Sequence, residues 1–446
     1  MMKLSQAAQI LQAKLQGPDG DFNGVSTDTR TLAPGQLFVA LRGGNFDGHH
    51  FLKEAVKAKA VGALISQDET AAIPTIKVAN TRQALADLSR FHRQQFSLPI
   101  IAVTGSCGKT TTRALLASVF SQAGNTLYSV SSFNNDIGVP LTLLKLNPEH
   151  QYAIIEMGAN HAGEIAFLTH LVHPDVAIIT NAAAAHLEGF GSLDGVACAK
   201  GEIFQGLASH GTAVINADDQ YAEFWKQLAG SRRIVTFGLS LAADVRADNI
   251  EYNENGQPSF ELTIREQKGP VQLQLMGRHN VHNALAAAAA GFAQGLSFPK
   301  ILAGLNQAAP EKQRLVEQRS PEGAIIIDDS YNANPLSMRA AIQLLALRSG
   351  ERILVMGDMG ELGEHAVTYH QQIGQEAKQM GIEYLFCYGQ LSRHAAQAFG
   401  KKAQHFSSPE ELVQALKSQL SEKITVLIKG SRFMKMEQVV AAVKVK

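Results

Sequence analysis

Short apolar runs recur through the middle of the chain and are separated by longer segments with helical periodicity. The runs lie at Ile100–Val103, Tyr152–Ile155, Val176–Ile179 and Thr212–Ile215. Continuous hydrophobicity of this kind is typical of strands that are buried on both faces in a parallel sheet. Residues 245–275 change to shorter alternating strands such as Phe260–Ile264. We therefore expect a central α/β unit whose parallel sheet is covered by helices on both faces.

A smaller α/β pattern precedes this region. An amphipathic helix begins near Leu4, and apolar strands follow at Leu37–Leu41 and Val61–Ile65. Polar segments around Ser26–Arg30 and Asn45–His50 are predicted to be loops or turns. The helical segment Arg82–Phe96 is expected to link this unit to the central one.

A third α/β pattern occupies the C-terminal part of the chain. Its strands are predicted at Ala324–Ile327, Arg352–Met356, Tyr384–Cys387 and Thr425–Ile428. Helices such as Pro335–Leu347 and Ala366–Met380 separate them, which favours a doubly wound, Rossmann-like domain. We expect three α/β domains, at residues 1–83, 84–310 and 311–446.

Composition supports a folded chain with several cores. At 446 residues the chain is too long for one core, and it is 45% hydrophobic and 18% charged. Its 40 basic and 40 acidic side chains cancel, which argues against nucleic acid or a membrane surface as a partner. No apolar run approaches the roughly 20 residues that span a bilayer. Residues 1–15 lack the long apolar stretch of a secretory signal.

The cysteines give a hint about the compartment. Cys107, Cys198 and Cys387 show no paired spacing of the kind that binds a metal. They are expected to be free thiols in a reducing environment, which predicts a cytoplasmic protein.

A glycine-bracketed turn follows the first central strand and leads into a helix. It consists of Thr104, Gly105, Ser106, Cys107, Gly108, Lys109, Thr110 and Thr111. Strand, glycine loop, lysine–hydroxyl pair and helix together predict a cradle for nucleotide phosphates, with Lys109 as a point charge and Thr110 as a hydroxyl for Mg²⁺. The alternative is a strand-to-helix turn that contains Gly-Lys-Thr by chance. The spacing is two residues shorter than in the usual phosphate loop.

Polar side chains follow the other central strands, where ligands gather in parallel sheets. Glu156 ends an apolar strand and is placed to hold Mg²⁺, although a strand-end acid can also face water. His186 follows the next strand, either as a metal contact or as an ordinary loop histidine. Lys200 lies in a predicted helix, where a surface lysine is the default interpretation. Asn134, Asn135 and Asp136 form either a turn or a substrate-contacting loop.

Three polar loops follow strands of the third unit. They are Asp328–Pro335, Gly357–Gly363 and Lys429–Arg432. Because the carboxyl ends of parallel strands meet at one edge of a sheet, we expect these loops to share a binding function.

Together these residues resemble the Mur ligases of peptidoglycan synthesis. The resemblance rests on the short loop Thr104–Thr110, on Glu156, Asn181, His186 and Lys200, and on Gly277–Asn280. It extends over nearly the whole chain and matches the three-domain order of that family. Further strings resemble the family member that adds a dipeptide: Asn134–Pro140, Glu156–His161, Ala185–Gly191, Asp329–Pro335 and Gly357–Met359.

The resemblance implies an ATP-dependent amide ligase of cytoplasmic cell-wall precursor synthesis. ATP would phosphorylate the terminal carboxylate of UDP-N-acetylmuramoyl-tripeptide, and the amine of D-Ala-D-Ala would attack the acyl phosphate. We expect these small molecules, and neither nucleic acid nor membrane, as partners of a monomeric enzyme.

The resemblance also implies roles for single residues. The loop from Thr104 to Thr111 would bind ATP together with Asn280, Asp329 and Arg314, and Lys109, His186 and Lys200 would be catalytic. Two Mg²⁺ ions would be held by Thr110, Glu156, His186 and Lys200, the lysine as a carbamate. The N-terminal unit would bind uridine diphosphate through Ser26, Thr27, Asp28, Arg30, Phe46, Asp47 and His49. The sugar-peptide would contact Asn134, Asn135 and Asp136, and the dipeptide Tyr331, Asn332 and Asn334.

Two departures from the family pattern stand out. Cys107 replaces a hydroxyl or amide residue, and Gln313-Arg314 replaces a common Gly-Arg pair near the domain hinge. The alternatives are another Mur ligase, a folylpolyglutamate synthase, or a phosphate-loop ATPase or switch that forms no amide. The N-terminal unit argues against the folate enzyme, and the polar C-terminal loops argue against a simple switch.

Overall fold

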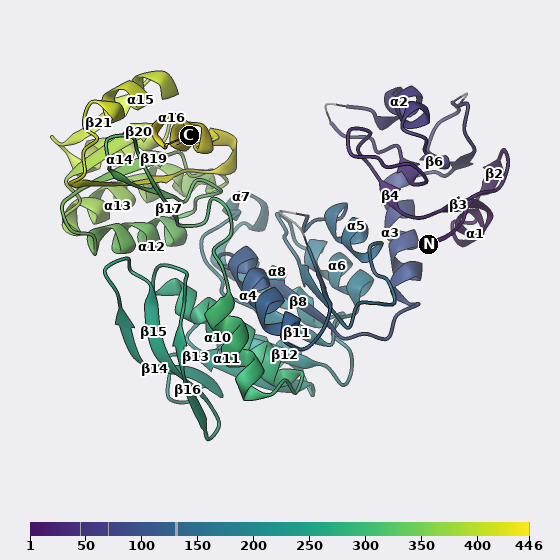
Figure 1. Ribbon diagram of the computed structural model, residues 1–446, viewed down its shortest axis with the longest axis horizontal. Helices are drawn as coiled ribbons and strands as arrows, with labels where there is room; N and C mark the ends of the chain where they lie inside the picture. The colour runs from purple at the N-terminus through teal and green to yellow at the C-terminus, as the bar shows by residue number, and fades with distance from the viewer. Residues whose placement is uncertain (45, 70, 130–132, 446) are drawn as a thin grey trace.

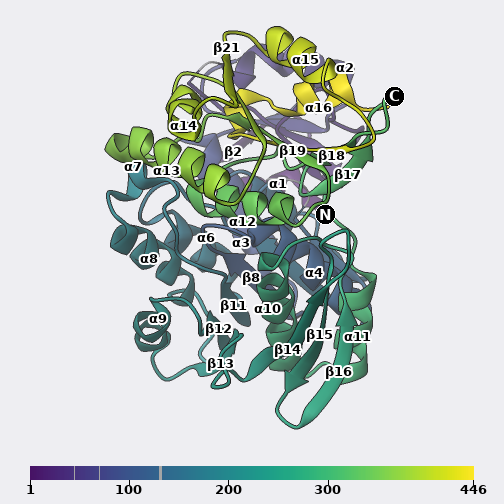
Figure 2. The ribbon, with the colours of Figure 1, turned by 90° about the vertical axis from the view of Figure 1, so that its left-hand side faces the viewer.

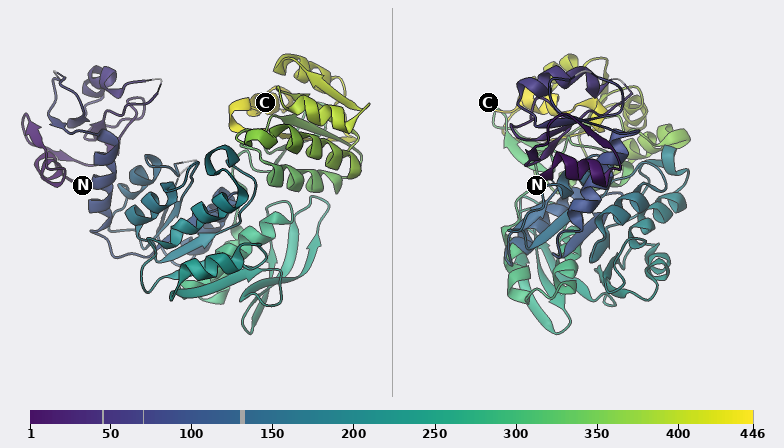
Figure 3. Two further views of the ribbon diagram at one scale, coloured as in Figure 1. Left: turned by 180° about the vertical axis from the view of Figure 1, so that it is seen from behind. Right: turned by 90° about the vertical axis from the view of Figure 1, so that its right-hand side faces the viewer.

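The described chain folds into three α/β units arranged as an open crescent (Figure 1). The computed structural model describes residues 1–44, 46–69, 71–129 and 133–445. The N-terminal and C-terminal units stand apart at the two ends of the central unit, as the view from behind also shows (Figure 3). No helix in these ranges is long and apolar enough to cross a membrane.

The central sheet is parallel over most of its width, as predicted. Its strand order is β16-β15-β14-β13-β12-β11-β8-β10-β9, and only the pairs β14–β15 and β15–β16 are antiparallel among the described residues. The strands are β8 (Ile100–Thr104), β9 (Thr126–Tyr128), β10 (Tyr152–Glu156), β11 (Val176–Ile179), β12 (Thr212–Asn216), β13 (Arg233–Gly238), β14 (Val245–Tyr252), β15 (Pro258–Ile264) and β16 (Gln267–Gln272).

Helices cover both faces of this sheet because successive side chains of each strand point to opposite sides. Ile101 and Val103 pack in the core beneath α4 (Lys109–Ser121), α10 (His279–Ala293) and α11 (Phe298–Gln307). Ile100 and Ala102 pack in the opposite core. The helices on that side are α5 (Gly138–Leu143), α6 (Glu164–Val172), α8 (Leu193–Gly201) and α9 (Ala222–Ala229).

The C-terminal sheet has the order β17-β18-β22-β19-β20-β21, with only β17 antiparallel to its neighbour among the described strands. The strands are β17 (Val316–Arg319), β18 (Ile325–Asp328), β19 (Glu351–Gly357), β20 (Tyr384–Tyr388), β21 (Ala403–Phe406) and β22 (Ile424–Lys429). Helices α12 (Pro335–Ala346), α13 (Ala366–Gln379) and α14 (Ser392–Phe399) cover one face; α15 (Pro409–Lys417) and α16 (Glu437–Val443) cover the other (Figure 2). This is the doubly wound arrangement expected from the sequence.

The N-terminal unit contains a smaller sheet in the order β2-β7-β6-β5-β4. Its elements are β1 (Met2–Lys3), α1 (Leu4–Ile10), β2 (Lys14–Gln16), β3 (Asp21–Phe22), β4 (Val25–Ser26), β5 (Leu37–Val39), α2 (Leu52–Lys57), β6 (Gly62–Ile65) and β7 (Thr75–Lys77). Because β4 and β5 are parallel neighbours, the loops that follow them leave the same edge of the sheet.

Helix α3 (Thr81–Arg93) joins this unit to the central one. Leu85 and Leu88 belong to the N-terminal core, whereas Ala86 belongs to the central core. The helix ends at Arg93, before the predicted Phe96. The Arg93 guanidinium donates to the Phe96 carbonyl at 2.6 Å, which holds the chain in a turn toward β8.

The contact between α11 and α4 depends on a small residue. A Cβ on Gly304 would overlap the backbone of Val119, and the Ser118 hydroxyl donates to the Gly304 carbonyl at 2.6 Å. We predict that Gly304→Ala destabilises the protein by about 1–3 kcal/mol, because overpacking forces the helices apart. Denaturant unfolding followed by circular dichroism would measure the change.

Lys300→Ala, on the exposed face of the same helix, is the matched control and should change stability by less than about 0.5 kcal/mol. Equal stability of Gly304→Ala and the wild type would contradict the close packing of α11 on α4.

Candidate active site

A cavity of about 1220 Å³ lies between the central and C-terminal units. One wall is formed by residues of the glycine loop, by Glu156 and by the start of α10. The other wall comes from the loops after β18, β19 and β22. The cavity therefore lies at the carboxyl ends of parallel strands from two different sheets, where ligands bind in α/β proteins.

The glycine loop requires both of its glycines. Gly105 has a φ of 148° and Gly108 a φ of 82°, which are conformations that favour glycine. A Cβ on Gly105 would overlap the Thr180 hydroxyl, and one on Gly108 would overlap the Asn283 amide. The close approach of these neighbours holds the loop in one shape.

Hydrogen bonds from the neighbouring strand end fix the loop further. The Cys107 amide donates to Asn181 Oδ1 at 3.0 Å, and the Thr180 hydroxyl donates to the Cys107 carbonyl at 2.6 Å. Beneath the loop, the buried Thr104 donates its hydroxyl to the Met157 carbonyl at 2.8 Å. The side chain of Thr104 thus supports the loop rather than facing the cavity.

Lys109 opens helix α4 and folds back over the loop. Its Nζ donates to the Gly105 carbonyl at 2.7 Å and to the Ser106 carbonyl at 3.4 Å. Burial lowers the pKa of this amine, while the nearby Glu156 opposes the effect. Ser106, Thr110 and Thr111 line the cavity beside it. The ammonium group is therefore held where an anion above the loop would meet it.

Glu156 is buried and does not face water. Its side chain is 2% exposed, and Oε1 accepts from Thr110 at 3.3 Å and from Asn134 at 2.8 Å. Oε2 has no hydrogen-bond partner among the described residues and lies 3.9 Å from Nε of Arg113. A buried carboxylate with one oxygen uncommitted beside a threonine hydroxyl suits a hard cation.

Arg113 was missed by sequence reasoning. It lies one turn after Lys109 on α4, is buried, and donates to Glu311 at 2.5 Å and to the carbonyl of Ser129. Its position on the helix that starts at the glycine loop was the available signal. Arg113 links the carboxylate region of the site to the segment that enters the C-terminal unit.

His186 and Lys200 both contact the ring of Phe190. Nδ1 of His186 contacts the carboxylate of Glu361 in the C-terminal unit, and the imidazole packs edge-on against Phe190 with 6.4 Å between the ring centroids. Nζ of Lys200 lies 5.1 Å from the same ring. Within the described ranges, no group of three or more His, Cys, Asp or Glu side chains could hold a metal ion.

Lys200 is not a surface lysine. The residue is 1% exposed, and its Nζ has no hydrogen-bond partner among the described residues. Burial, together with the charge of Lys109, lowers its pKa to about 7. An amine with this pKa is partly neutral near pH 7, and a neutral amine is nucleophilic.

Asn280 and Asn283 lie one turn apart on α10. Asn280 donates its amide to the Met276 carbonyl at 2.7 Å and accepts from Asn283 at 2.8 Å. Asn283 was not among the predicted site residues, although its spacing of three from Asn280 places both on one helix face. Both residues line the cavity.

Arg314 reaches the glycine loop in spite of the missing glycine before it. Its Nη2 donates to the Thr110 hydroxyl at 3.4 Å, and its Cζ lies 4.2 Å from the ring centroid of Tyr331. Gln313 has a φ of 61°. The backbone thus takes at Gln313 the left-handed conformation that glycine adopts more readily.

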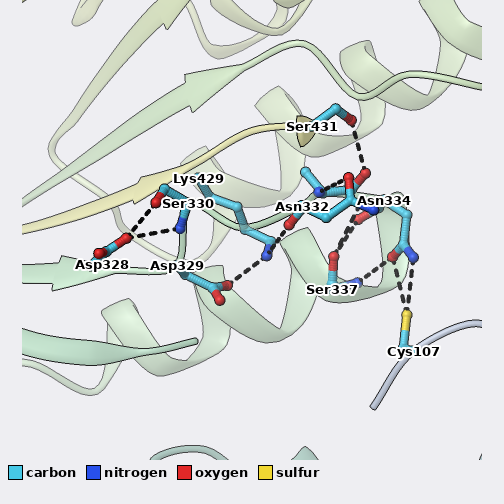
Figure 4. A network of polar contacts seen from close by, with 10 residues as sticks. Cys107, Asp328, Asp329, Ser330, Asn332, Asn334, Ser337, Lys429 and Ser431 are labelled. Carbon is cyan, nitrogen blue, oxygen red and sulfur yellow. Dashed lines mark hydrogen bonds and ion pairs between the residues drawn. The ribbon is translucent and has the colours of Figure 1, made fainter. Parts of the chain in front are cut away.

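The loop after β18 is held by a buried lysine (Figure 4). Nζ of Lys429 donates to Oδ2 of Asp329 at 2.6 Å and to the Asn332 carbonyl at 2.8 Å. The Ser431 hydroxyl donates to the Ala333 carbonyl at 3.1 Å. The amide of Gly360, in the loop after β19, donates to the Ser431 hydroxyl at 2.8 Å. The three predicted C-terminal loops are therefore close together.

Asn334 connects this loop to the glycine loop across the cavity. Its side chain accepts from the Ser337 amide at 2.9 Å and so caps α12. The same side-chain amide lies 3.1 Å from Sγ of Cys107, as Figure 4 shows. The unusual cysteine of the loop is thus in direct contact with the C-terminal unit.

The remaining predicted residues lie elsewhere. Asp28 binds Arg30 at 2.6 Å, and Asp47 binds His49 at 2.5 Å, while Phe46 is exposed. Ser26 ends β4, and the other residues lie in the segments that follow β4 and β5. The lining of the described cavity includes none of them.

The 134–136 segment lies between these two regions. Asn134 reaches Glu156, Asn135 accepts from the Gly138 amide at 2.9 Å, and Asp136 pairs with Arg82 of α3 at 3.2 Å. A ligand bound to this segment would lie between the N-terminal unit and the buried carboxylate.

Family models and relatives agree with this architecture. The Mur ligase family catalytic domain model matches residues 21–93, the Mur ligase middle domain residues 103–291, and the Mur ligase glutamate ligase domain residues 313–432. The UDP-N-acetylmuramoyl-tripeptide–D-alanyl-D-alanine ligase of Escherichia coli is 45% identical over 446 residues, covering 99% of this chain and 98% of the relative. The enzyme of the same name from Haemophilus influenzae is 40% identical, covering 100% and 99%.

A solved structure has the same fold. The crystal structure of MurF from Acinetobacter baumannii superimposes with a TM-score of 0.92 at 37% sequence identity, covering 99% of this chain and 98% of that one. The three matched domains, the full-length relatives and the shared fold lead to one conclusion. This chain belongs to the Mur ligase family.

Proposed function

We propose that this protein joins D-Ala-D-Ala to UDP-N-acetylmuramoyl-tripeptide at the expense of ATP, through an acyl phosphate. The observation that carries the proposal is the single cavity in which Lys109, Thr110 and Glu156 face Tyr331, Asn332 and Asn334. A phosphate cradle and a second polar wall are what amide formation from a carboxylate and an amine requires. The full-length relatives that carry this name support the choice of substrates.

Phosphoryl transfer to the tripeptide carboxylate is the first step. The backbone amides at the start of α4 and the ammonium of Lys109 hold the phosphates, and Arg314 approaches from the C-terminal unit through its contact with Thr110. Asn280 and Asp329 flank the nucleotide on the two walls. Cation charge around the transferred phosphoryl group stabilises the transition state, in which negative charge accumulates on its oxygens.

The residues present suit magnesium. Oε1 of Glu156 accepts from the Thr110 hydroxyl, and Oε2 has no hydrogen-bond partner among the described residues. Mg²⁺ is usually held by one or two carboxylates plus phosphate oxygens. His186 and a carbamate on Lys200 would hold a second ion near the carboxylate. Bound Mg²⁺ would neutralise phosphate charge and polarise the transferred group.

Lys200 suits carbamylation for two reasons. Its buried amine has a pKa lowered to about 7, so a neutral nucleophile is available for CO₂. As the pH falls below that value the amine becomes protonated, and formation of the carbamate is disfavoured. Carbamylation replaces a buried cation with an anionic oxygen ligand, which removes the cost of an unpaired buried ammonium.

The second step is attack by the dipeptide amine on the acyl phosphate, with loss of phosphate. Tyr331, Asn332 and Asn334 provide the wall on which the dipeptide lies. The uridine diphosphate end of the other substrate binds the loops after β4 and β5, and the sugar-peptide passes Asn134, Asn135 and Asp136 on its way to Glu156. We place the reaction in the cytoplasm and expect the enzyme to act as a monomer.

The decisive experiment incubates purified protein with ATP, Mg²⁺, D-Ala-D-Ala and UDP-N-acetylmuramoyl-tripeptide. We expect a product with the mass of the pentapeptide precursor and phosphate release that depends on both substrates. Phosphate release without either substrate would favour an ATPase. A product with glutamate or another amino acid, but not with the dipeptide, would favour a different Mur ligase or a folylpolyglutamate synthase.

We predict that Lys109→Ala lowers kcat for ligation by at least about 100-fold, because one preorganised charge at the transferred group is lost. Product mass and phosphate release would both measure the effect. Lys226→Ala, which removes a partly exposed lysine on α9 outside the cavity, is the control and should retain wild-type turnover. Undiminished ligation by Lys109→Ala would contradict the proposed role of the glycine loop in phosphate binding.

We predict that Lys200→Ala lowers kcat by about 100-fold and that millimolar acetate or propionate restores part of the activity. The small carboxylate would occupy the space of the carbamate and supply its oxygens. Sodium chloride at equal ionic strength is the control for salt effects. Full activity of Lys200→Ala without any additive would exclude the carbamate.

A further inference from the structure

The proposed dipeptide substrate brings a carboxylate that takes no part in the reaction. Its amine end attacks the acyl phosphate, so its other end keeps a full negative charge inside the cavity. Burying a carboxylate without a cation or several donors is costly. The protein must therefore supply a partner for this charge, and the inference below rests on the proposed function.

Most of the lysine and arginine side chains that line the cavity already contact other groups of the protein. The basic side chains there are Lys109, Arg278, Arg314, Arg339, Lys429 and Arg432. Lys109 and Arg314 contact the glycine loop. Arg339 is held by Glu376 at 2.9 Å and by Gln372 at 3.3 Å. Lys429 is buried against Asp329.

Two arginines remain, and they lie on different walls. Arg278 precedes α10 in the central unit, on the side where Asn280 lies. Arg432 follows β22 in the C-terminal unit, at the start of the short helix η4 (Arg432–Met434). The dipeptide wall proposed above belongs to the C-terminal unit, so Arg432 is the cation beside it.

The surroundings of Arg432 leave it able to exchange partners. Its side chain is 57% exposed and pairs with Glu437 at 3.0 Å. An ion pair this exposed contributes little, because water screens it. Ser431 before it is already bonded to the Ala333 carbonyl, which fixes the backbone from which Arg432 extends.

Arg432 and Arg314 both lie near the ring of Tyr331, which relates Arg432 to the place where the dipeptide amine would react. The Cζ of Arg432 lies 5.9 Å from the ring centroid, and the Cζ of Arg314 lies 4.2 Å from the same centroid. Arg314 in turn contacts Thr110 of the glycine loop. A dipeptide spans at most about 7 Å, so its amine can face the phosphate side of Tyr331 while its carboxylate faces Arg432.

We propose that Arg432 binds the C-terminal carboxylate of the incoming dipeptide and thereby selects a peptide that ends in a free acid. The guanidinium offers two parallel N–H donors to the two carboxylate oxygens. The ring of Tyr331 supports the guanidinium from one side. Glu437 holds the arginine ready until the carboxylate takes its place.

The test compares two substrates on two enzymes. Ligation of D-Ala-D-Ala and of D-alanyl-D-alaninamide, in which the carboxylate is an uncharged amide, is followed by product mass with wild-type protein and with Arg432→Met. We expect the wild type to prefer the acid by about tenfold or more in kcat/KM, and Arg432→Met to use both substrates equally. The loss of kcat/KM for the acid in Arg432→Met should come mainly from a higher KM.

Further variants separate binding from folding. Arg432→Lys keeps the charge without the planar pair of donors and should retain part of the preference. Arg393→Met removes an exposed arginine of the same unit outside the cavity and should keep all of it. Glu437→Gln frees Arg432 and should keep or increase the preference.

A full wild-type preference in Arg432→Met, or a wild type without preference, would overturn the role of Arg432 while leaving the ligase proposal intact. Loss of the preference in Glu437→Gln would overturn it as well. Failure of the wild type to ligate either substrate would instead overturn the proposed function and the inference with it.

Discussion

The contact between the glycine loop and the end of β11 is the constraint on which the site depends. Thr180 and Asn181 bond the loop from one side, and Asn283 lies against Gly108 from the other. These neighbours leave no room for a side chain on either glycine. The loop therefore has its shape before any ligand arrives, and an anion binds without the cost of ordering it.

Charge balance around this loop explains the unusual lysines. Lys109 and Arg113 both lie near the buried carboxylate of Glu156, and the charge of Lys109 also acts on Lys200. Such a site favours anions, and burial lowers the pKa of both lysines in the absence of one. A triphosphate and a carbamate would each relieve this excess of positive charge. The charges that the described residues place around the pocket thus suit an anionic ligand.

Much of the fold could be predicted from sequence because the strands are buried on both faces. Val176–Ile179 was placed at its observed bounds, since a continuous apolar run between polar turns has few other solutions. The end of α3 was missed because it depends on a side-chain hydrogen bond from Arg93 to Phe96. The glycine loop was predicted from its local motif, and both of its glycines adopt a positive φ.

The rest of the site depends on contacts between distant segments, and sequence pattern carries little information about these. Arg113 meets Glu311, and Cys107 meets Asn334, only after the sheets have packed. The burial of Lys200 could not be predicted from the local sequence. Helix α8 is only weakly amphipathic, and a lysine in such a helix is expected to be exposed. Resemblance to a family suggested roles for Cys107, Lys200 and Asn334 but none for Arg113.

The backbone at Gln313 affects the stiffness of the joint between the central and C-terminal units. Gln313 and Leu315 both adopt left-handed φ angles, 61° and 53°, and each costs about 1 kcal/mol for a residue with a Cβ. Glycine would relieve that strain but would also let the chain sample many more directions. The backbone is consequently restricted at two positions between the central and C-terminal units, and the joint is stiffer than one built with glycine.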